Sequence, residues 1–290
     1  NTPLIKLTRL AEAAGVNIWA KAEFANPSGS VKDRAAYAMI SDGIRRGAIT
    51  KDKIIIDATS GNTGISYAMI GAALGYAVRL YLPKNASVER KNIMRNYGAA
   101  IIETSPLEGS DGAYLAANRE FEAHPEKYFY PNQYNNPVNP LAHYNATGVE
   151  IWEQSGHKVT HFITGTGTSG TLMGVSRRLK EYNHDIITAA VQPDSPLHGI
   201  EGTKHIPSTI KPAICDLSAV DRIISVSTDE AYRTTRRLAR EEGIFAGISS
   251  GANVAAALKL ARTAPPDSFI VTVLCDGGTR YLSDAFWETP

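Results

Sequence analysis

Apolar residues recur along the chain at two spacings, one typical of strands and the other of helices. Short apolar runs lie at 53–57, 77–82, 159–163 and 269–275. Most are followed by a stretch in which apolar residues return at helical spacing, as at 64–75. Strands that alternate with helices in this way form parallel sheets with crossover helices. The pattern therefore predicts an α/β fold.

One segment interrupts this alternation. Residues 130–148 are rich in Pro and Asn and have no regular period, which is typical of a connection. A chain of 290 residues is also longer than one average domain. We therefore expect two α/β units joined by this segment.

Composition excludes several classes of protein. The 30 basic and 29 acidic residues leave a net charge of +1, so neither nucleic acid nor an anionic membrane surface is indicated as a partner. The longest apolar run, Tyr67–Val78, is too short to span a bilayer, and a cytoplasmic location is the default expectation. Cys215 and Cys275 make neither a disulfide framework nor a metal site, and we expect both thiols to be buried. No metal is expected.

Two glycine-rich loops each follow an apolar run and precede a helical stretch. They are TSGNTG at Thr59–Gly64 and GTGTSGT at Gly165–Thr171. Ligands of parallel sheets gather at the carboxyl ends of strands, where such loops lie. Glycine lets the backbone approach an anion closely, and a helix N-terminus offers unpaired N–H donors. Both loops are therefore candidate anion sites.

The second loop also fits a dinucleotide fingerprint. Gly165, Gly167 and Gly170 match G-x-G-x-x-G, and Asp194 follows the next strand. Alone, this pattern would predict an NAD-dependent dehydrogenase. The alternative is a simple turn between a strand and a helix.

The first loop suggests a different ligand. Its hydroxyl and backbone donors could bind a carboxylate and leave the Asn62 amide for another partner. The alternative is a polar helix cap built on Ser60 or Asn62.

Lys32 lies where a folding argument would not place a cation. In NPSGSVKDRAA it falls in the first turn of a predicted helix, where the helix dipole disfavours an ammonium. A neutral amine is a nucleophile that can form a Schiff base with an aldehyde. The alternative is an exposed lysine beside Asp33 and Arg34.

Seven motifs in chain order carry a resemblance to a known family. They are NTPLIKL, NPSGSVKDRAA, TSGNTG, NPVNPLAHYNATGVEIW, GTGTSGT, EGIFAGISSGA and RYLS. Together they resemble the pyridoxal-phosphate enzymes of the cysteine synthase family, and its B-type members most. The likeness runs from Asn1 to about Ser283.

The resemblance implies a fold and a domain division. The expected fold is α/β, with two three-layer α/β/α domains, mostly parallel sheets and the tryptophan synthase β-like arrangement. A larger cofactor-binding domain would comprise residues 1–35 and 145–290. A smaller mobile domain, 36–144, would carry the carboxylate loop. A homodimer is expected.

The resemblance also implies roles for individual residues. Lys32 would bind pyridoxal phosphate as a Schiff base and act as acid and base at the substrate Cα. Asn62 would bond the ring hydroxyl, and Ser249 would face the ring nitrogen. The phosphate would be bound by Gly167, Thr168, Ser169, Gly170 and Thr171. The substrate carboxylate would be bound by Thr59, Ser60, Gly61, Thr63 and Gln133. This assignment replaces the dinucleotide interpretation.

The implied reaction is conversion of O-acetyl-L-serine and sulfide into L-cysteine and acetate. Alternatives are O-phosphoserine sulfhydrylase, cystathionine β-synthase and a non-catalytic pyridoxal-binding relative. The loop at 194–212 departs from the B-type pattern, and relatives that accept phosphoserine carry an arginine near Lys204. Lys204 could meet an anionic leaving group as a point charge. It could equally be a solvated loop lysine.

Overall fold

The computed structural model describes residues 1–12, 16–59 and 61–288. Ser60, expected to bind substrate, lies outside the described residues. The chain forms two compact units, one of Asn1–Val31 with Pro140–Pro290 and the other of Lys32–Asn139. We refer to them as the larger and the smaller unit.

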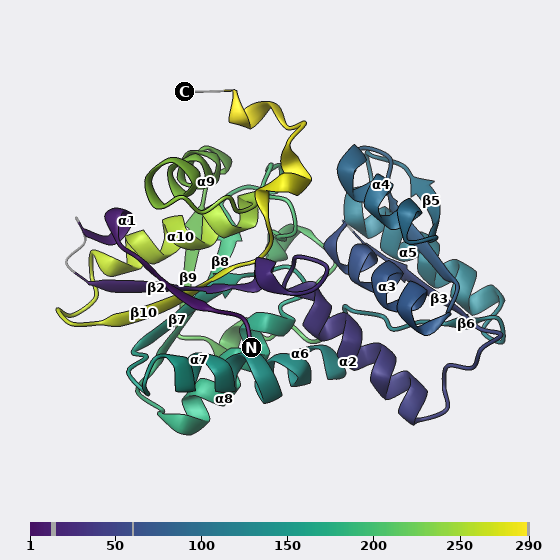
Figure 1. The fold of residues 1–290 in the computed structure, drawn as a ribbon, viewed down its shortest axis with the longest axis horizontal. Coiled ribbons are helices and arrows are strands. Elements are labelled where there is room, and N and C mark those ends of the chain that lie inside the picture. Colours follow the sequence, from purple (N-terminus) through teal and green to yellow (C-terminus); the bar gives the residue numbers. More distant parts are fainter. Residues whose placement is uncertain (13–15, 60, 289–290) are drawn as a thin grey trace. The chain divides into compact units, whose positions relative to one another are not determined.

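The larger unit is a sheet with helices on both faces (Figure 1). Its strands are β1 (Leu4–Leu7), β2 (Asn17–Ala22), β7 (His161–Gly165), β8 (Ile187–Pro193), β9 (Arg222–Val226) and β10 (Phe269–Leu274). Its helices are α1 (Arg9–Glu12), α7 (Gly148–Gln154), α8 (Gly170–Tyr182), α9 (Thr228–Glu242) and α10 (Ile248–Ala261). Short 3-10 helices lie at Glu23–Ala25, Ile206–Ser208, Leu217–Ala219, Gly278–Tyr281 and Ala285–Trp287.

The strand order of this sheet, in the described part of the chain, is β1-β2-β10-β7-β8-β9. Only the β1–β2 pairing among these is antiparallel. Alternate residues of β10 enter different cores, because successive strand side chains point to opposite faces. Ile270 packs with residues of α9 and α10, whereas Val271 packs with residues of α7 and α8. Burial on both faces explains the continuous apolar runs of the sequence.

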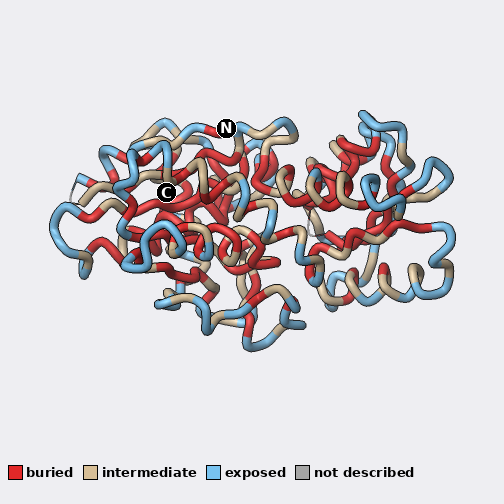
Figure 2. Tube along the Cα trace, turned by 90° about the horizontal axis from the view of Figure 1, so that it is seen from below, coloured by how far each residue is buried: buried red, intermediate tan, exposed pale blue. Residues whose placement is uncertain are grey.

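The smaller unit has its own sheet, ordered β5-β4-β3-β6 with parallel pairings throughout the described strands. The strands are β3 (Ile54–Ala58), β4 (Val78–Pro83), β5 (Ala100–Thr104) and β6 (Tyr128–Phe129). The helices are α2 (Lys32–Arg45), α3 (Asn62–Leu74), α4 (Val88–Asn96) and α5 (Gly109–Ala123). Ile55 faces α2, α3 and α4, and Ile56 faces α5. Figure 2 shows buried positions gathered inside each unit and exposed positions on the outer turns. The expected α/β fold is thus confirmed.

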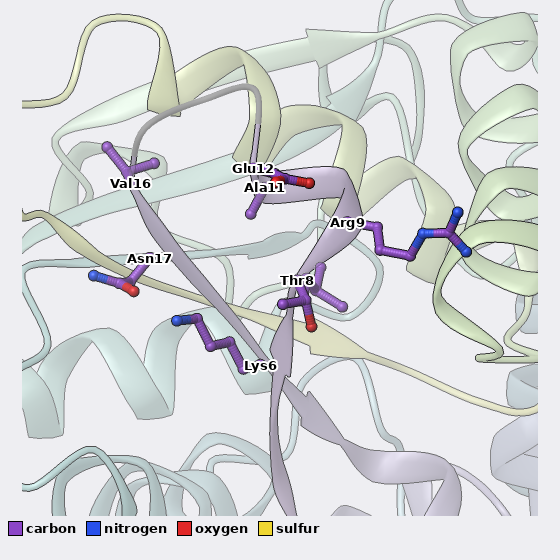
Figure 3. A pocket seen from close by; sticks show the side chains of 8 residues that line it. Lys6, Thr8, Arg9, Ala11, Glu12, Val16 and Asn17 are labelled. Carbon is purple, nitrogen blue, oxygen red and sulfur yellow. The ribbon is translucent and has the colours of Figure 1, made fainter.

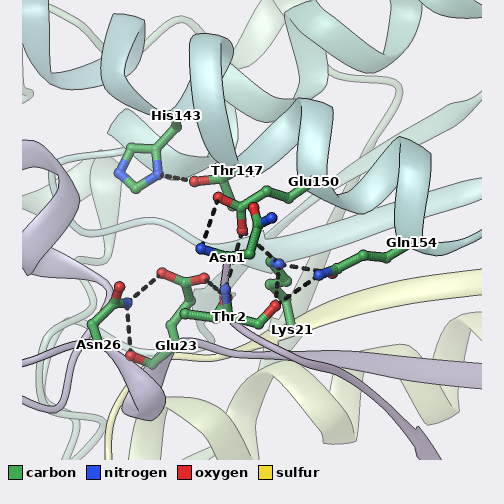
Figure 4. A network of polar contacts seen from close by, with 9 residues as sticks. All are labelled: Asn1, Thr2, Lys21, Glu23, Asn26, His143, Thr147, Glu150 and Gln154. Carbon is green, nitrogen blue, oxygen red and sulfur yellow. Dashed lines mark hydrogen bonds and ion pairs between the residues drawn. The ribbon is translucent and has the colours of Figure 1, made fainter.

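A polar network ties the N-terminal segment to α7 (Figure 4). Lys21 is 0% exposed, and its ammonium lies 2.7 Å from a Glu150 carboxylate oxygen. It also donates to the Gln154 side chain at 2.8 Å and to the Thr2 carbonyl at 2.6 Å. A buried charge is tolerated when it is paired and hydrogen-bonded in this way. The network therefore fixes the first residues on the edge of the larger unit.

The segment at 130–148 is more regular than the sequence suggested. It contains α6 (Val138–Ala142), which spans the boundary between the units, and a π-helix (His143–Thr147) that leads into α7. The backbone there is held by close packing. A Cβ at Gly174 of α8 would lie 2.1 Å from the Pro140 carbonyl oxygen, so only glycine allows this approach. Packing against α8 therefore determines the backbone conformation of this segment, and its Pro- and Asn-rich composition does not.

One cysteine expectation needs correction. Cys215 is buried, but Cys275, which directly follows the carboxyl end of β10, is partly exposed. Among the described residues no helix is long and apolar enough to cross a bilayer. In the same part of the chain no cluster of three or more His, Cys, Asp or Glu side chains could hold a metal ion.

Candidate active site

The two glycine-rich loops lie at the carboxyl ends of parallel strands, one in each unit. Thr59–Thr63 follows β3 and leads into α3. Gly165–Thr171 follows β7 and leads into α8. Each loop therefore has the position in which α/β sheets bind ligands.

The Thr59–Thr63 loop is held by its own hydroxyl groups. The buried Thr59 hydroxyl oxygen accepts N–H groups from Gly61 at 2.9 Å and from Gly64 at 3.1 Å. A hydroxyl that accepts two hydrogen bonds keeps its own hydrogen to donate. Asn62 begins α3, and the N-cap position before it is Gly61, so Asn62 is not itself the N-cap of this helix.

Gln133 joins this loop from the segment after β6. Its side-chain amide donates to the Ala58 carbonyl at 2.6 Å, and its side-chain oxygen accepts from the Thr63 hydroxyl at 2.7 Å. Gln133 and Thr63 are both buried. The structure thus brings together Thr59, Gly61, Thr63 and Gln133, four of the residues predicted to bind a carboxylate.

A buried guanidinium packs against the same loop. Arg90 of α4 is 2% exposed, and a Cβ at Gly61 would lie 2.2 Å from its Cδ. Gly61 also has φ of +148°, which L side chains rarely adopt. Sequence reasoning missed Arg90, because an arginine within a charged helical stretch usually faces solvent.

Lys32 is the first residue of α2 and is partly buried rather than exposed. Its neighbour Asp33 is buried and accepts a hydrogen bond from the Ser66 hydroxyl of α3 at 2.5 Å. The Ser66 hydroxyl also lies 3.1 Å from the Asn62 carbonyl oxygen. The start of α2 is therefore tied to the start of α3, and with it Lys32 to Asn62, inside the smaller unit.

The second loop has the features of a phosphate site. Ser169 adopts φ of 70°, in the left-handed region, directly before α8. Its hydroxyl oxygen is buried and has no hydrogen-bond partner among the described residues. Buried polar groups are otherwise nearly always bonded, so this one fits an absent acceptor. The N-terminus of α8 lies directly after Ser169, and the backbone N–H groups of a helix N-terminus favour a phosphate.

The Gly165–Thr171 loop is packed closely against neighbouring segments of the larger unit. A Cβ at Gly167 would lie 2.4 Å from the Gly202 carbonyl oxygen. The Thr171 hydroxyl lies 3.3 Å from Nε2 of His143, whose Nδ1 lies 3.0 Å from the Thr147 hydroxyl. His143 is buried in the π-helix and positions the loop from there. The residues present fit a bound phosphate group.

Ser249 lies in the first turn of α10 and is buried. One turn further, Asn253 donates to the Val273 carbonyl at 2.9 Å. The Asn253 side-chain oxygen is buried with no hydrogen-bond partner among the described residues. A Cβ at Gly165 would lie 3.3 Å from that oxygen, so this face of α10 borders the second loop.

Lys204 is 7% exposed, so the solvated alternative is wrong. Its N–H donates to the Thr166 carbonyl, and the Thr166 hydroxyl donates to the Lys204 carbonyl at 3.0 Å. Thr166 belongs to the second glycine loop. These bonds place the Lys204 backbone beside the candidate phosphate site.

A separate pocket lies at the N-terminal strand (Figure 3). Its lining includes Lys6, Arg9, Glu12 and Asn17. None of the residues predicted from the sequence to bind substrate or cofactor lines it. We assign it no role.

Comparison with known proteins agrees with the resemblance found in the sequence. Residues 1–276 match the family described as pyridoxal-phosphate dependent enzymes. The chain is 50% identical over 294 residues to cysteine synthase of Aquifex aeolicus, covering 99% of this chain and 90% of that protein. It is 45% identical to cysteine synthase B of Salmonella typhimurium, covering 98% of this chain and 92% of that protein. The crystal structure of cysteine synthase from Entamoeba histolytica superposes with a TM-score of 0.93 and 35% identity, covering 100% of this chain and 89% of that chain.

Proposed function

Because the chain belongs to the cysteine synthase family of pyridoxal-phosphate dependent enzymes, we propose that it converts O-acetyl-L-serine and sulfide into L-cysteine and acetate. The pair of anion-binding loops at strand ends carries the proposal. An amino-acid substrate brings a carboxylate and the cofactor a phosphate, so the two loops match the two anions. Family membership also sets aside the dehydrogenase interpretation of Gly165–Gly170.

The proposed cofactor contacts are those that the resemblance to the family implies. Lys32 would bind the cofactor covalently, and Asn62 would donate to its ring hydroxyl. The phosphate would accept from the Ser169 hydroxyl, which otherwise has no partner among the described residues. The rest of the phosphate site would be Gly167, Thr168, Gly170 and Thr171. When bound, pyridoxal phosphate supplies electron withdrawal that makes the Cα proton of an amino acid acidic.

The protein side chains then orient the substrate and move its protons. Thr59, Thr63 and Gln133 hold the substrate carboxylate, which fixes the Cα hydrogen in one direction. The Lys32 amine takes that proton from Cα and returns a proton to Cα after sulfur has added to Cβ. Ser249 would face the ring nitrogen with a neutral hydroxyl, which would not hold a proton there as a carboxylate would. Prompt loss of a leaving group from Cβ therefore suits this site better than racemisation or transamination.

A substrate comparison tests the proposed function. We expect kcat/KM with sulfide to be higher for O-acetyl-L-serine than for O-phospho-L-serine, by about tenfold or more. We expect sulfide to be preferred to homocysteine as the acceptor. The opposite order for either pair would assign the protein to the phosphoserine or the cystathionine reaction instead.

Lys204 provides the matched variant for this test. If its ammonium meets an anionic leaving group, Lys204→Ala should lower kcat/KM for phosphoserine by about tenfold and for acetylserine by less. Lys211→Ala, on the same loop but exposed, serves as the control for loss of a positive charge. Equal losses for the two substrates would show that Lys204 does not contact the leaving group.

We also propose that the protein is a cytoplasmic homodimer. In addition, we propose that the smaller unit moves when the substrate carboxylate binds to the Thr59–Thr63 loop. Such a movement would shield the reacting atoms from water. Small-angle scattering of the holoprotein should then show a smaller radius of gyration with L-alanine than with L-alaninamide, which lacks the carboxylate. The same curves should give twice the mass of one chain. An unchanged radius contradicts the movement, and a single-chain mass contradicts the dimer.

A further inference from the structure

The carboxyl group of Asp57 lies buried at the end of β3, directly before the Thr59–Thr63 loop. Its side chain is 0% exposed. One oxygen accepts the Ala58 N–H at 2.8 Å. The other accepts the Tyr67 hydroxyl at 2.9 Å and the Gln133 N–H at 3.3 Å. No basic side chain of the described residues offsets its charge.

Among the described residues, the elements that adjoin Asp57 place no basic side chain beside it. Its register partner on β4 is Leu80, and α5 packs Ala113 and Ala117 against β3. Three tyrosines face it, Tyr67 from α3 and both Tyr130 and Tyr134 from the segment after β6. Beyond them, Asp111 and Tyr114 of α5 face Tyr134. Burial in these surroundings raises the pKa of Asp57 to about 7.

Asp57 is in direct contact with Gln133, one of the residues proposed to bind the substrate carboxylate. Gln133 meets Asp57 with its backbone N–H, while its side chain bonds Ala58 and Thr63 at the carboxylate loop. A substrate carboxylate held by Gln133 and Thr63 would therefore lie roughly one glutamine length from the Asp57 carboxyl group. Little water separates them, because Asp57, Thr63 and Gln133 are all buried.

We propose that Asp57 is a positioning residue whose ionised form, acting through Gln133 and by direct repulsion, weakens binding of the substrate carboxylate, whereas its protonated form does not. The proposal rests on the proposed function, because it assumes that the Thr59–Thr63 loop holds an amino-acid carboxylate. The proton of the neutral form can bond Tyr67, whose hydroxyl can reverse from donor to acceptor; the two N–H partners cannot.

The sign of the expected pH effect follows from the charges. Below about pH 7 Asp57 is neutral and the loop sees only the substrate carboxylate; above it, two negative charges face each other. Two like charges about 10 Å apart at an effective dielectric of ~20 change a binding constant roughly tenfold. Amino-acid affinity should therefore fall roughly tenfold as the pH rises from 6 to 8.5.

Direct binding of an unreactive amino acid tests this inference. L-Alanine has the carboxylate and the amine but no leaving group, so its dissociation constant from the holoprotein can be measured by calorimetry at each pH. In Asp57→Asn the constant should not show the step near pH 7 that the parent protein shows. The amine of L-alanine titrates in the same way for both proteins, so its effect cancels in the ratio of their two dissociation constants. L-Alaninamide lacks the carboxylate, so its dissociation constant should be the same for both proteins at every pH.

Tyr67→Phe provides a second measurement that does not depend on the asparagine variant. Loss of the hydroxyl donor removes a bond that stabilises the Asp57 carboxylate, so the midpoint of the pH step should move above that of the parent protein. A purely structural role would weaken binding without moving the midpoint. If the parent and Asp57→Asn proteins bind L-alanine with the same pH dependence, or the Tyr67→Phe midpoint stays in place, the inference is wrong. If the parent protein binds no amino acid at any pH, the proposed function fails instead.

Discussion

Replacement of Lys32 by alanine should abolish cysteine formation, with a loss on the order of 10³-fold or more in kcat. The reason is that one amine is proposed both to attach the cofactor and to move the proton at Cα. Lys32 is held for both tasks at the start of α2, where the bond between Ser66 and Asp33 fixes the first turn. The loss should be in kcat, because the proposed carboxylate contacts of Thr59, Thr63 and Gln133 remain.

Covalent attachment can be measured separately from activity. Borohydride reduction of the parent holoprotein should leave the cofactor on the peptide that contains Lys32, and Lys32→Ala should release it on denaturation. Lys158→Ala, an exposed lysine of the larger unit, is the matched control and should behave like the parent protein. A Lys32→Ala protein that makes cysteine at the parent rate would overturn the mechanism.

Replacement of Gly167 by alanine should cause the largest loss of cofactor affinity among the loop variants. The added Cβ would lie 2.4 Å from the Gly202 carbonyl oxygen, which is backbone and cannot rotate away. Overpacking of this kind costs about 1–3 kcal/mol, and a shift of the loop would also displace the groups that we propose to bind the phosphate. The dissociation constant of pyridoxal phosphate should therefore rise by about tenfold or more, measured by equilibrium dialysis.

A second glycine offers the control for this variant. Gly277 of the same unit has its nearest side-chain atoms 3.9 Å and 4.0 Å from an added Cβ, which is ordinary contact. Gly277→Ala should keep the cofactor affinity of the parent protein. Parent-like affinity in Gly167→Ala would mean that the Gly165–Thr171 loop does not bind the phosphate.

The sequence pattern predicted the interior strands well, because strands buried on both faces leave long apolar runs. The runs at 159–163 and 269–275 correspond to β7 and β10, although the observed strands are His161–Gly165 and Phe269–Leu274. The pattern did not predict β1, a short antiparallel edge strand with only one residue, Leu7, fully buried. It also missed α6 and the π-helix, which depend on packing against α8 rather than on local propensity.

Candidate site residues were found where a residue type was locally unusual. A lysine at a helix start and two glycine-rich loops stand out in the sequence without any structure. Asp57 and Arg90 do not, because an acid at the end of a strand or an arginine in a charged helix is common. What distinguishes them is burial at 0% and 2%, which arises only when β3, α3 and α4 are packed together. Residues whose role depends on surroundings assembled from distant segments cannot be identified from spacing alone.

The strand order of the larger unit sets a limit on the order in which the chain can fold during synthesis. β10 is an interior strand, paired with β2 on one side and β7 on the other, yet among the described strands it is the last to leave the ribosome. The larger sheet cannot close until Leu274 has been synthesised, so β2, which pairs with β1 on one side, must wait for its second partner almost the length of the chain away. The smaller sheet needs nothing beyond Phe129. The smaller unit of the nascent protein can thus be ordered while the larger unit is still an open set of strands.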